Sequence, residues 1–290
     1  MGSIESPEKV SFLSRNLKLA ANFYPAKPGS PDRAKAAIII CHPWTSIKER
    51  SPANYARVLT KAGFICLAYD AAYQGESEGE PRNLEYPYQR VEDIKPAVTY
   101  LIGREDVNSD KIGVLGISCA TSAAVDMGTM VRRGFDKDSS NLSVLQGQLE
   151  NAAKDRNSDV GGPKVDILHM LPEKIEDVPD DLPESFKDLA NYYRTPRAYH
   201  PRATNTCLPR SWDIMANFDA FAHNYMISPR PLLMITGTKA ATKWYSEDGV
   251  AKAKEPKELV VIDRLTHADL YDHVDEAGAK LVEFFGHHLA

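Results

Sequence analysis

Ser118 stands at the end of a short apolar run, in the sequence Gly116-Ile117-Ser118-Cys119-Ala120. A serine lifted onto a sharp turn after a buried strand is a nucleophile for acyl transfer, and small residues usually flank it two positions before and two positions after. Here alanine replaces the usual glycine at the second of these positions. The segment predicts a nucleophilic serine, although the same pattern also fits an ordinary serine between a strand and a loop.

His267 is the candidate general base for this serine. It follows a predicted strand at residues 257–264, in the segment "RLTHADLYD". A serine nucleophile needs a base within hydrogen-bond reach, and a histidine in the loop after the last strand supplies one in a known chain order. The residue alone would also fit a surface loop, but the strand before it favours the catalytic interpretation.

The acid that would orient His267 is not obvious from the sequence. Its usual place, shortly after the strand predicted at residues 230–237, falls in "GTKAAT", which contains no carboxylate. Glu247, followed by Asp248, lies later in the same connection and also fits the first turn of a helix. Asp126 is the other candidate if it ends a strand. The two alternatives remain open.

The segment "CHPWTS", residues 41–46, leaves the first predicted parallel strand. A backbone N–H in such a loop stabilises an oxyanion together with the N–H of the residue that follows the nucleophile. Trp44 and Cys119 are therefore the predicted oxyanion donors. A plain loop in which Trp44 fills a gap explains the segment nearly as well.

Composition excludes several classes of protein. The 290 residues carry a formal net charge of −5 and no basic stripe, which argues against nucleic-acid binding. No apolar run is long enough to span a membrane, and the first residues do not form a signal peptide. Four dispersed cysteines without a CxxC motif indicate a reduced, cytoplasmic protein; they are Cys41, Cys66, Cys119 and Cys207.

Carboxylates crowd one segment, "YDAAYQGESEGEP", which contains Asp70, Glu76 and Glu78. A metal site would need further ligands, and no histidine stands at ligand spacing from them. The H-E-x-x-H motif is also absent from the sequence. We therefore predict a turn beside the active site, with no metal and no cofactor.

Three short apolar runs indicate buried parallel strands, at residues 37–41, 64–70 and 111–118. The helices predicted between them cover residues 51–63 and 87–104, and the second must be kinked by Pro96 or hold it in its first turn. Strands that alternate with helices in this way form right-handed βαβ units and a parallel sheet.

The rest of the chain adds a hairpin, an insertion and two further strands. Residues 8–25 predict an antiparallel edge hairpin, whereas residues 129–224 break the alternation and carry predicted helices at 141–156 and 183–194. Buried strands and a closing amphipathic helix follow at residues 230–237, 257–264 and 273–289. The sequence therefore predicts one α/β domain over residues 1–290, with a mostly parallel sheet flanked by helices and an inserted helical cap at 129–224.

Four segments together resemble one subgroup of the α/β-hydrolases: "HPWTSIKER", "YDAAYQGESEGEP", "YYRTPRAYHP" and "THADLYD". The subgroup includes bacterial hydrolases of uncertain substrate and fungal enzymes that release or transfer polyketide acyl groups from carrier-protein thioesters. The resemblance implies the α/β-hydrolase fold and an acyl-enzyme formed on Ser118 with His267 as base. It also implies a small-molecule ester or thioester substrate, free or bound to a carrier protein, and is compatible with a homodimer.

The chain departs from this subgroup directly after Ser118. Relatives place a helix and then a strand between the serine turn and the segment that matches "SAAVDMG", but here Ser118 and Ala123 are five residues apart. Either residues 119–134 serve as the helix and the strand is lost, or they are the strand and the helix is lost. A helix N-terminus behind the serine helps to orient the oxyanion donor, so its loss would weaken catalysis.

The leading hypothesis is a serine hydrolase or acyltransferase that acts on an ester or thioester of a sizeable acyl chain. The predicted cap supplies aromatic walls for such a chain, namely Tyr192, Tyr193, Tyr199 and Trp212. The acceptor, water or an alcohol, stays open because it depends on how well the cap excludes water. The alternative is a catalytically impaired hydrolase-fold protein that acts as a binding or cyclisation scaffold.

Overall fold

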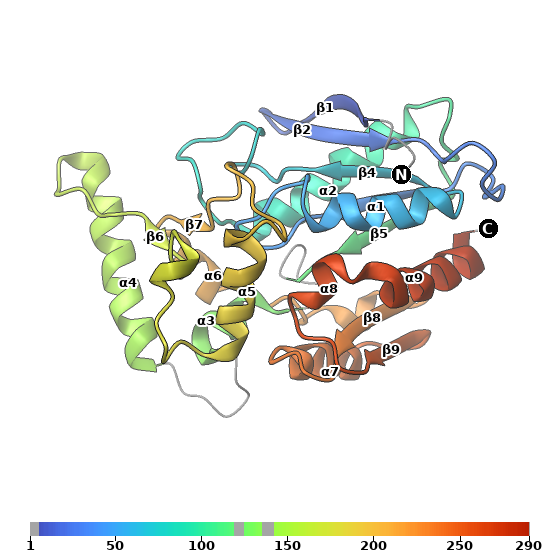
Figure 1. Cartoon of the computed structure of the whole chain (residues 1–290). Coiled ribbons are helices and arrows are strands. Elements are labelled where there is room, and N and C mark those ends of the chain that lie inside the picture. Colours follow the sequence, from blue (N-terminus) through green and yellow to red (C-terminus); the bar gives the residue numbers. More distant parts are fainter. Residues whose placement is uncertain (1–5, 119–124, 135–141, 290) are drawn as a thin grey trace.

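Five strands form the central sheet of this computed structural model, which describes residues 6–118, 125–134 and 142–289 (Figure 1). They are β1 (Glu8–Ser14), β2 (Leu17–Tyr24), β3 (Ala37–Cys41), β4 (Ile65–Tyr69) and β5 (Ile112–Gly116). Their order in the sheet is β1-β2-β4-β3-β5. β1 and β2 form the predicted antiparallel hairpin, and β4, β3 and β5 run parallel.

Three long helices cover the faces of this sheet: α1 (Ser51–Lys61), α2 (Pro87–Ile102) and α9 (Val274–Leu289). Ile38 on β3 packs in one core with Leu59 of α1 and Phe285 of α9. The next residue, Ile39, belongs to a second core with Leu101 of α2. Both faces of β3 are thus buried, which is why its sequence is a continuous apolar run. Pro96 lies in the interior of α2 and not in its first turn.

Two further strands stand apart from the central sheet. β8 (Leu232–Gly237) and β9 (Lys257–Ile262) pair parallel with each other as a separate two-stranded sheet. The sequence predicts one mostly parallel sheet that includes them. The predicted α/β fold, with a sheet flanked by helices, is confirmed. Among the described residues β8 and β9 nevertheless form a sheet of their own, because no described strand joins β5 to β8.

The sequence leaves open whether residues 119–134 form a helix or a strand, and the structure describes residues 125–134 of this segment. Met127–Arg133 form a short helix, α3, whose N-cap is Asp126. Residues 127–133 are therefore helical. For residues 119–124 both alternatives stay open, because these residues lie outside the described part of the chain. The helix begins nine positions after Ser118, and the positions between them that hold Cys119 and Ala120 lie outside the described residues.

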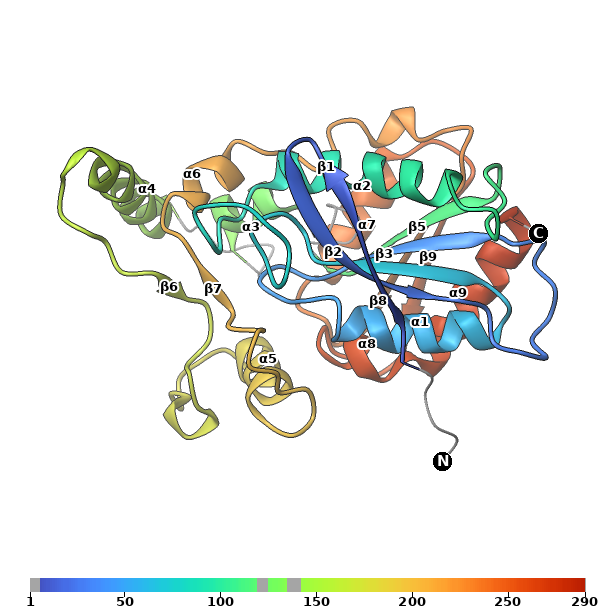
Figure 2. The same cartoon turned by 90° about the horizontal axis from the view of Figure 1, so that it is seen from above.

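Between residues 127 and 216 the helices and two short strands lie to one side of the sheets (Figures 1 and 2). Besides α3 they are α4 (Leu142–Asn157), β6 (Leu168–His169), α5 (Glu184–Arg194), β7 (Thr206–Cys207) and α6 (Ser211–Ala216). Single 3₁₀ turns occupy Ser158–Val160, Ile175–Asp177 and Asn224–Met226. The two helices predicted for this segment form as α4 and α5.

One helix follows each strand of the second sheet. α7 (Lys243–Lys252) connects β8 to β9, and α8 (Asp269–Asp272) is a single turn that precedes α9. In the part of the chain that the structure describes, no helix is both long enough and apolar enough to cross a bilayer.

Candidate active site

Ser118 lies directly beyond the end of β5 in a strained backbone conformation. Its φ of 58° falls in the left-handed region that residues with a side chain rarely adopt. The backbone N–H of Ile117 donates to the carbonyl of Cys41 at 3.3 Å, so the pairing of β5 with β3 is maintained up to the residue before the serine. Strain of this kind persists only where the surrounding structure imposes it, and it is characteristic of a serine presented on a sharp turn.

The structure brings Ser118 and His267 together from positions 149 residues apart. Ser118 Oγ lies 2.9 Å from Nε2 of His267, and the hydroxyl of Tyr271 lies at the same distance from that nitrogen. The other ring nitrogen, Nδ1, lies 2.7 Å from Oγ1 of Thr242. The imidazole is thus held between three hydroxyl groups.

The imidazole of His267 is largely surrounded by protein. Desolvation disfavours its charged form and lowers the pKa of His267 from the usual 6.5 to about 4. A neighbouring carboxylate would oppose this effect by stabilising the imidazolium, but within the described part of the chain only burial shifts the pKa of His267. His267 is therefore neutral at physiological pH, which is the form in which a histidine accepts a proton.

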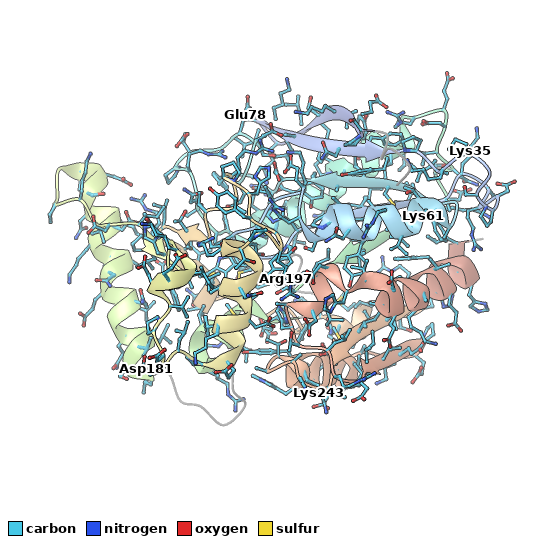
Figure 3. The ribbon with its side chains drawn as sticks, in the orientation of Figure 1. Lys35, Lys61, Glu78, Asp181, Arg197 and Lys243 are labelled. Carbon is cyan, nitrogen blue, oxygen red and sulfur yellow. The ribbon has the colours of Figure 1, made fainter. Side chains whose placement is uncertain are left out.

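The loop that carries His267 is anchored from both ends. The N–H of Thr266 donates to the carboxylate of Asp269 at 3.0 Å, and the N–H of Asp269 donates back to Oγ1 of Thr266 at 3.1 Å. Arg197, between α5 and α8 in Figure 3, forms ion pairs with Asp269 at 3.0 Å and with Asp272 at 2.7 Å. These contacts join "YYRTPR" to "HADLYD" and hold the loop of His267 in place.

A second set of ion pairs joins the other two segments of the resemblance. The side chain of Lys48 is 1% exposed, and its Nζ lies 2.6 Å from Asp70 and 2.6 Å from Glu76. The carboxylates of "YDAAYQGESEGEP" thus neutralise a buried lysine, as a buried charge requires. Among the described residues no group of histidine, cysteine and carboxylate side chains could hold a metal ion.

Neither candidate acid lies beside His267. Glu247 is on α7 with a side chain that is 46% exposed, and it pairs with Lys243 at 3.4 Å. Asp126 is buried, and its carboxylate accepts from the N–H of Gly128 at 3.1 Å and of Ala220 at 3.0 Å. In the described part of the chain, the contact at His267 Nδ1 comes instead from Thr242.

We expect Glu247→Gln and Asp126→Asn to leave turnover within about twofold of wild type, because neither carboxylate reaches the imidazole. Asp126→Ala should nevertheless lower the free energy of unfolding by about 1 kcal/mol, since it removes a helix N-cap. Steady-state rates on an activated ester and thermal unfolding measure the two effects separately. A tenfold loss of turnover in either conservative variant would show that this carboxylate acts on His267.

Two cavities meet at Ser118 and His267. The first, here called the cap-side cavity, has a volume of about 60 Å³ and is lined mainly by Trp44, Met170, Leu171, Phe186, Leu189 and Tyr193 besides the serine and histidine. Of the four aromatic side chains expected to form its wall, only Tyr193 does so. Tyr192 is buried within the core, Tyr199 is 60% exposed, and Trp212 packs edge-on against Trp44.

The second cavity, here called the strand-gap cavity, lies between the two sheets and has a volume of about 160 Å³. Its walls are residues 114–118 of the β5 segment, residues 231–236 of the β8 segment, and side chains of α9. It occupies the place where a strand between β5 and β8 would lie.

The predicted oxyanion donors are only partly described. Trp44 lines the cap-side cavity together with Ser118, and the next residue, Thr45, has a positive φ of 54°. The loop after β3 therefore turns sharply beside the serine. Cys119, the other predicted donor, lies outside the described residues.

Sequence reasoning missed two residues that contact His267. Thr242 lies in the "GTKAAT" segment, at the place expected for the acid, but it offers a hydroxyl in place of a carboxylate. Tyr271 stands four residues after His267 in "HADLYD", and α8 places its hydroxyl beside the ring. A search for any hydrogen-bonding side chain after β8, and not only for carboxylates, would have found Thr242.

A sheet flanked by helices, with a serine on a strained turn and a histidine after the last strand, defines the α/β-hydrolase class. No protein-family model matches the chain. The chain is 33% identical over 303 aligned positions to the uncharacterized protein YcjY of Escherichia coli K12, covering 96% of this chain and 97% of that protein. The chain therefore belongs to the same α/β-hydrolase family as YcjY, and it is an enzyme of this type.

Solved structures show the same relationship. The crystal structure of the hypothetical protein PA2218 from Pseudomonas aeruginosa matches with a TM-score of 0.88 at 32% identity, covering 100% of this chain and 96% of that chain. The α/β-hydrolase GrgF from Penicillium sp. sh18 has the same fold, with a TM-score of 0.79 at 21% identity and coverage of 97% and 98%. A curated relative named polyketide transferase grgF is 25% identical over 94% of this chain and 94% of its own length.

Proposed function

We propose that this protein is a serine hydrolase or acyltransferase that takes the acyl group of an ester or thioester onto Ser118. The observation that carries the proposal is the 2.9 Å contact between Ser118 Oγ and His267 Nε2 at a strained turn. The name of the relative grgF, a polyketide transferase, supports acyl transfer as the reaction class.

In the proposed reaction His267 accepts the hydroxyl proton of Ser118 at Nε2 while the serine oxygen attacks the carbonyl carbon. The Nδ1 nitrogen keeps the ring's other proton, and this N–H donates a hydrogen bond to Oγ1 of Thr242. The backbone N–H of Trp44 stabilises the oxyanion. Collapse of the tetrahedral intermediate transfers the proton from His267 to the leaving oxygen or sulfur, and water or an alcohol releases the acyl group by the same steps in reverse.

Thr242 takes the place that a carboxylate has in a complete triad, and the replacement has a chemical consequence. A carboxylate only accepts hydrogen bonds, so it enforces the tautomer with a proton on Nδ1. A hydroxyl both donates and accepts, so Thr242 positions the ring without selecting the tautomer. It also adds no negative charge to stabilise the imidazolium. We therefore expect a functional but slow enzyme.

A fluorophosphonate probe is expected to label the wild-type protein covalently and to give no labelling of Ser118→Ala. Ser246→Ala is the matched control, because Ser246 also lines the strand-gap cavity but lies on α7. Labelling can be followed by intact-protein mass spectrometry. Unlabelled wild-type protein that is folded would reject the acyl-enzyme and favour the alternative of a binding or cyclisation scaffold.

A further inference from the structure

The strand-gap cavity is an unusual feature for the interior of a sheet. β5 pairs with β3 along one edge, and β8 pairs with β9 along one edge. Among the described strands, β5 and β8 have no partner along their other edges, and residues of both strands line the strand-gap cavity. Val114, on β5, is 42% exposed although it belongs to a strand next to the fully buried β3. Apolar side chains at this position would normally be covered by the next strand.

Polar and apolar groups are separated along the length of this cavity. Ser118, His267 and Thr242 line it where β5 and β8 end. Toward the beginning of the same strands its walls are aliphatic or aromatic, and they include Val114, Leu232 and Phe284. A ligand that fits this arrangement has a reactive polar group at one end and an apolar tail at the other.

The volume of the cavity sets the size of that tail. Apolar cavities of about 150 Å³ accommodate a benzene ring, and the strand-gap cavity has about 160 Å³. The cap-side cavity, at about 60 Å³, is smaller. An acyl group of roughly six carbons, straight or as a phenyl ring, therefore matches the strand gap better than the space beneath the cap.

We propose that the strand-gap cavity is the acyl-binding site, so that the acyl chain extends from Ser118 between β5 and β8 while the leaving group faces the cap. The inference rests on the proposed function. It assigns substrates with an apolar acyl group of about six carbons.

Three esters test the assignment: nitrophenyl acetate, nitrophenyl hexanoate and hexyl acetate. Ile235, on β8, lines the cavity, and Ile235→Phe should fill it. We expect this variant to lower the ratio of kcat/KM for nitrophenyl hexanoate to that for nitrophenyl acetate at least tenfold, because a larger side chain excludes the acyl tail. Hexyl acetate carries its tail on the alcohol, and its rate should follow that of nitrophenyl acetate.

Two further variants keep the test decisive. Leu233→Ala enlarges the same cavity and should raise the rate on nitrophenyl octanoate relative to hexanoate, which provides an answer if Ile235→Phe does not fold. Val261→Phe is the matched control, because Val261 lies on β9, is 40% exposed and does not line the cavity. It should leave all of these ratios unchanged.

The outcomes separate this inference from the function on which it rests. Turnover that requires Ser118 but responds equally to Ile235→Phe for all three esters would overturn the acyl-binding site alone. A loss confined to hexyl acetate would overturn it as well, because it would place the alcohol in the gap. Absence of any turnover that depends on Ser118 would overturn the proposed function and the inference together.

Discussion

Replacing His267 with alanine is expected to lower kcat/KM for an activated ester by about 10²-fold or more. In a complete triad, loss of the histidine costs about 10⁶-fold in rate and loss of the acid alone about 10⁴-fold, so a histidine without its acid still contributes about 10². Because His267 contacts a hydroxyl in place of a carboxylate, we expect a loss of rate near about 10²-fold and not the about 10⁶-fold loss of a complete triad.

Initial rates on nitrophenyl acetate measure this loss, and thermal unfolding shows whether the variant is folded. We expect only a small change in Tm, because His267 lies in a loop and part of the residue is exposed. His287→Ala, near the end of α9, is the matched control and should behave as wild type. Turnover of His267→Ala within tenfold of wild type would remove His267 from the mechanism.

Thr242→Asp is expected to raise kcat/KM at least tenfold, with the ~10⁴-fold effect of a triad acid as the upper bound. A carboxylate at this position would accept the Nδ1 proton of His267, hold the productive tautomer and stabilise the imidazolium that forms in the transition state. Oγ1 of Thr242 already lies 2.7 Å from Nδ1, so the substitution places the acid on the correct side of the ring.

The pH profile provides a second measurement of the same change. The base must be neutral to accept a proton, so kcat/KM falls as pH drops through the pKa of His267. Because that pKa is lowered from 6.5 to about 4, the wild-type rate should persist well below pH 6.5. A new carboxylate favours the imidazolium and raises the pKa, so the acid limb of Thr242→Asp should move to higher pH.

Thr242→Asn is the matched control for shape, because it has the size of aspartate without the charge and should not accelerate the reaction. Thr242→Ser retains the hydroxyl and should stay within a few-fold of wild type. The prediction fails if folded Thr242→Asp is no faster than Thr242→Asn and its acid limb does not move. In that case the lack of a carboxylate beside the imidazole would not limit the rate.

Much of the fold could be predicted from the sequence because its signals are local. The apolar runs that become β3 and β4 are continuous, since helices bury both faces of each strand, and such runs need no knowledge of their neighbours. Ser118 and His267 are also identifiable from local context, as residues that come after predicted strands. The structure then brings their side chains within 2.9 Å of each other.

Only the tertiary structure decided which side chain contacts His267 and that a cavity lies between β5 and β8. Asp126 has the right chemistry for a triad acid, but its carboxylate caps α3, whereas Thr242 lacks the charge and nevertheless reaches Nδ1. The cavity between β5 and β8 is likewise visible only in the structure, because it is lined by residues of segments more than 100 positions apart. The sequence by itself predicted the main strands and helices and the candidate nucleophile, because these depend on apolar periodicity and turn chemistry. Contacts across the gap are set by packing between distant segments, which local sequence does not encode.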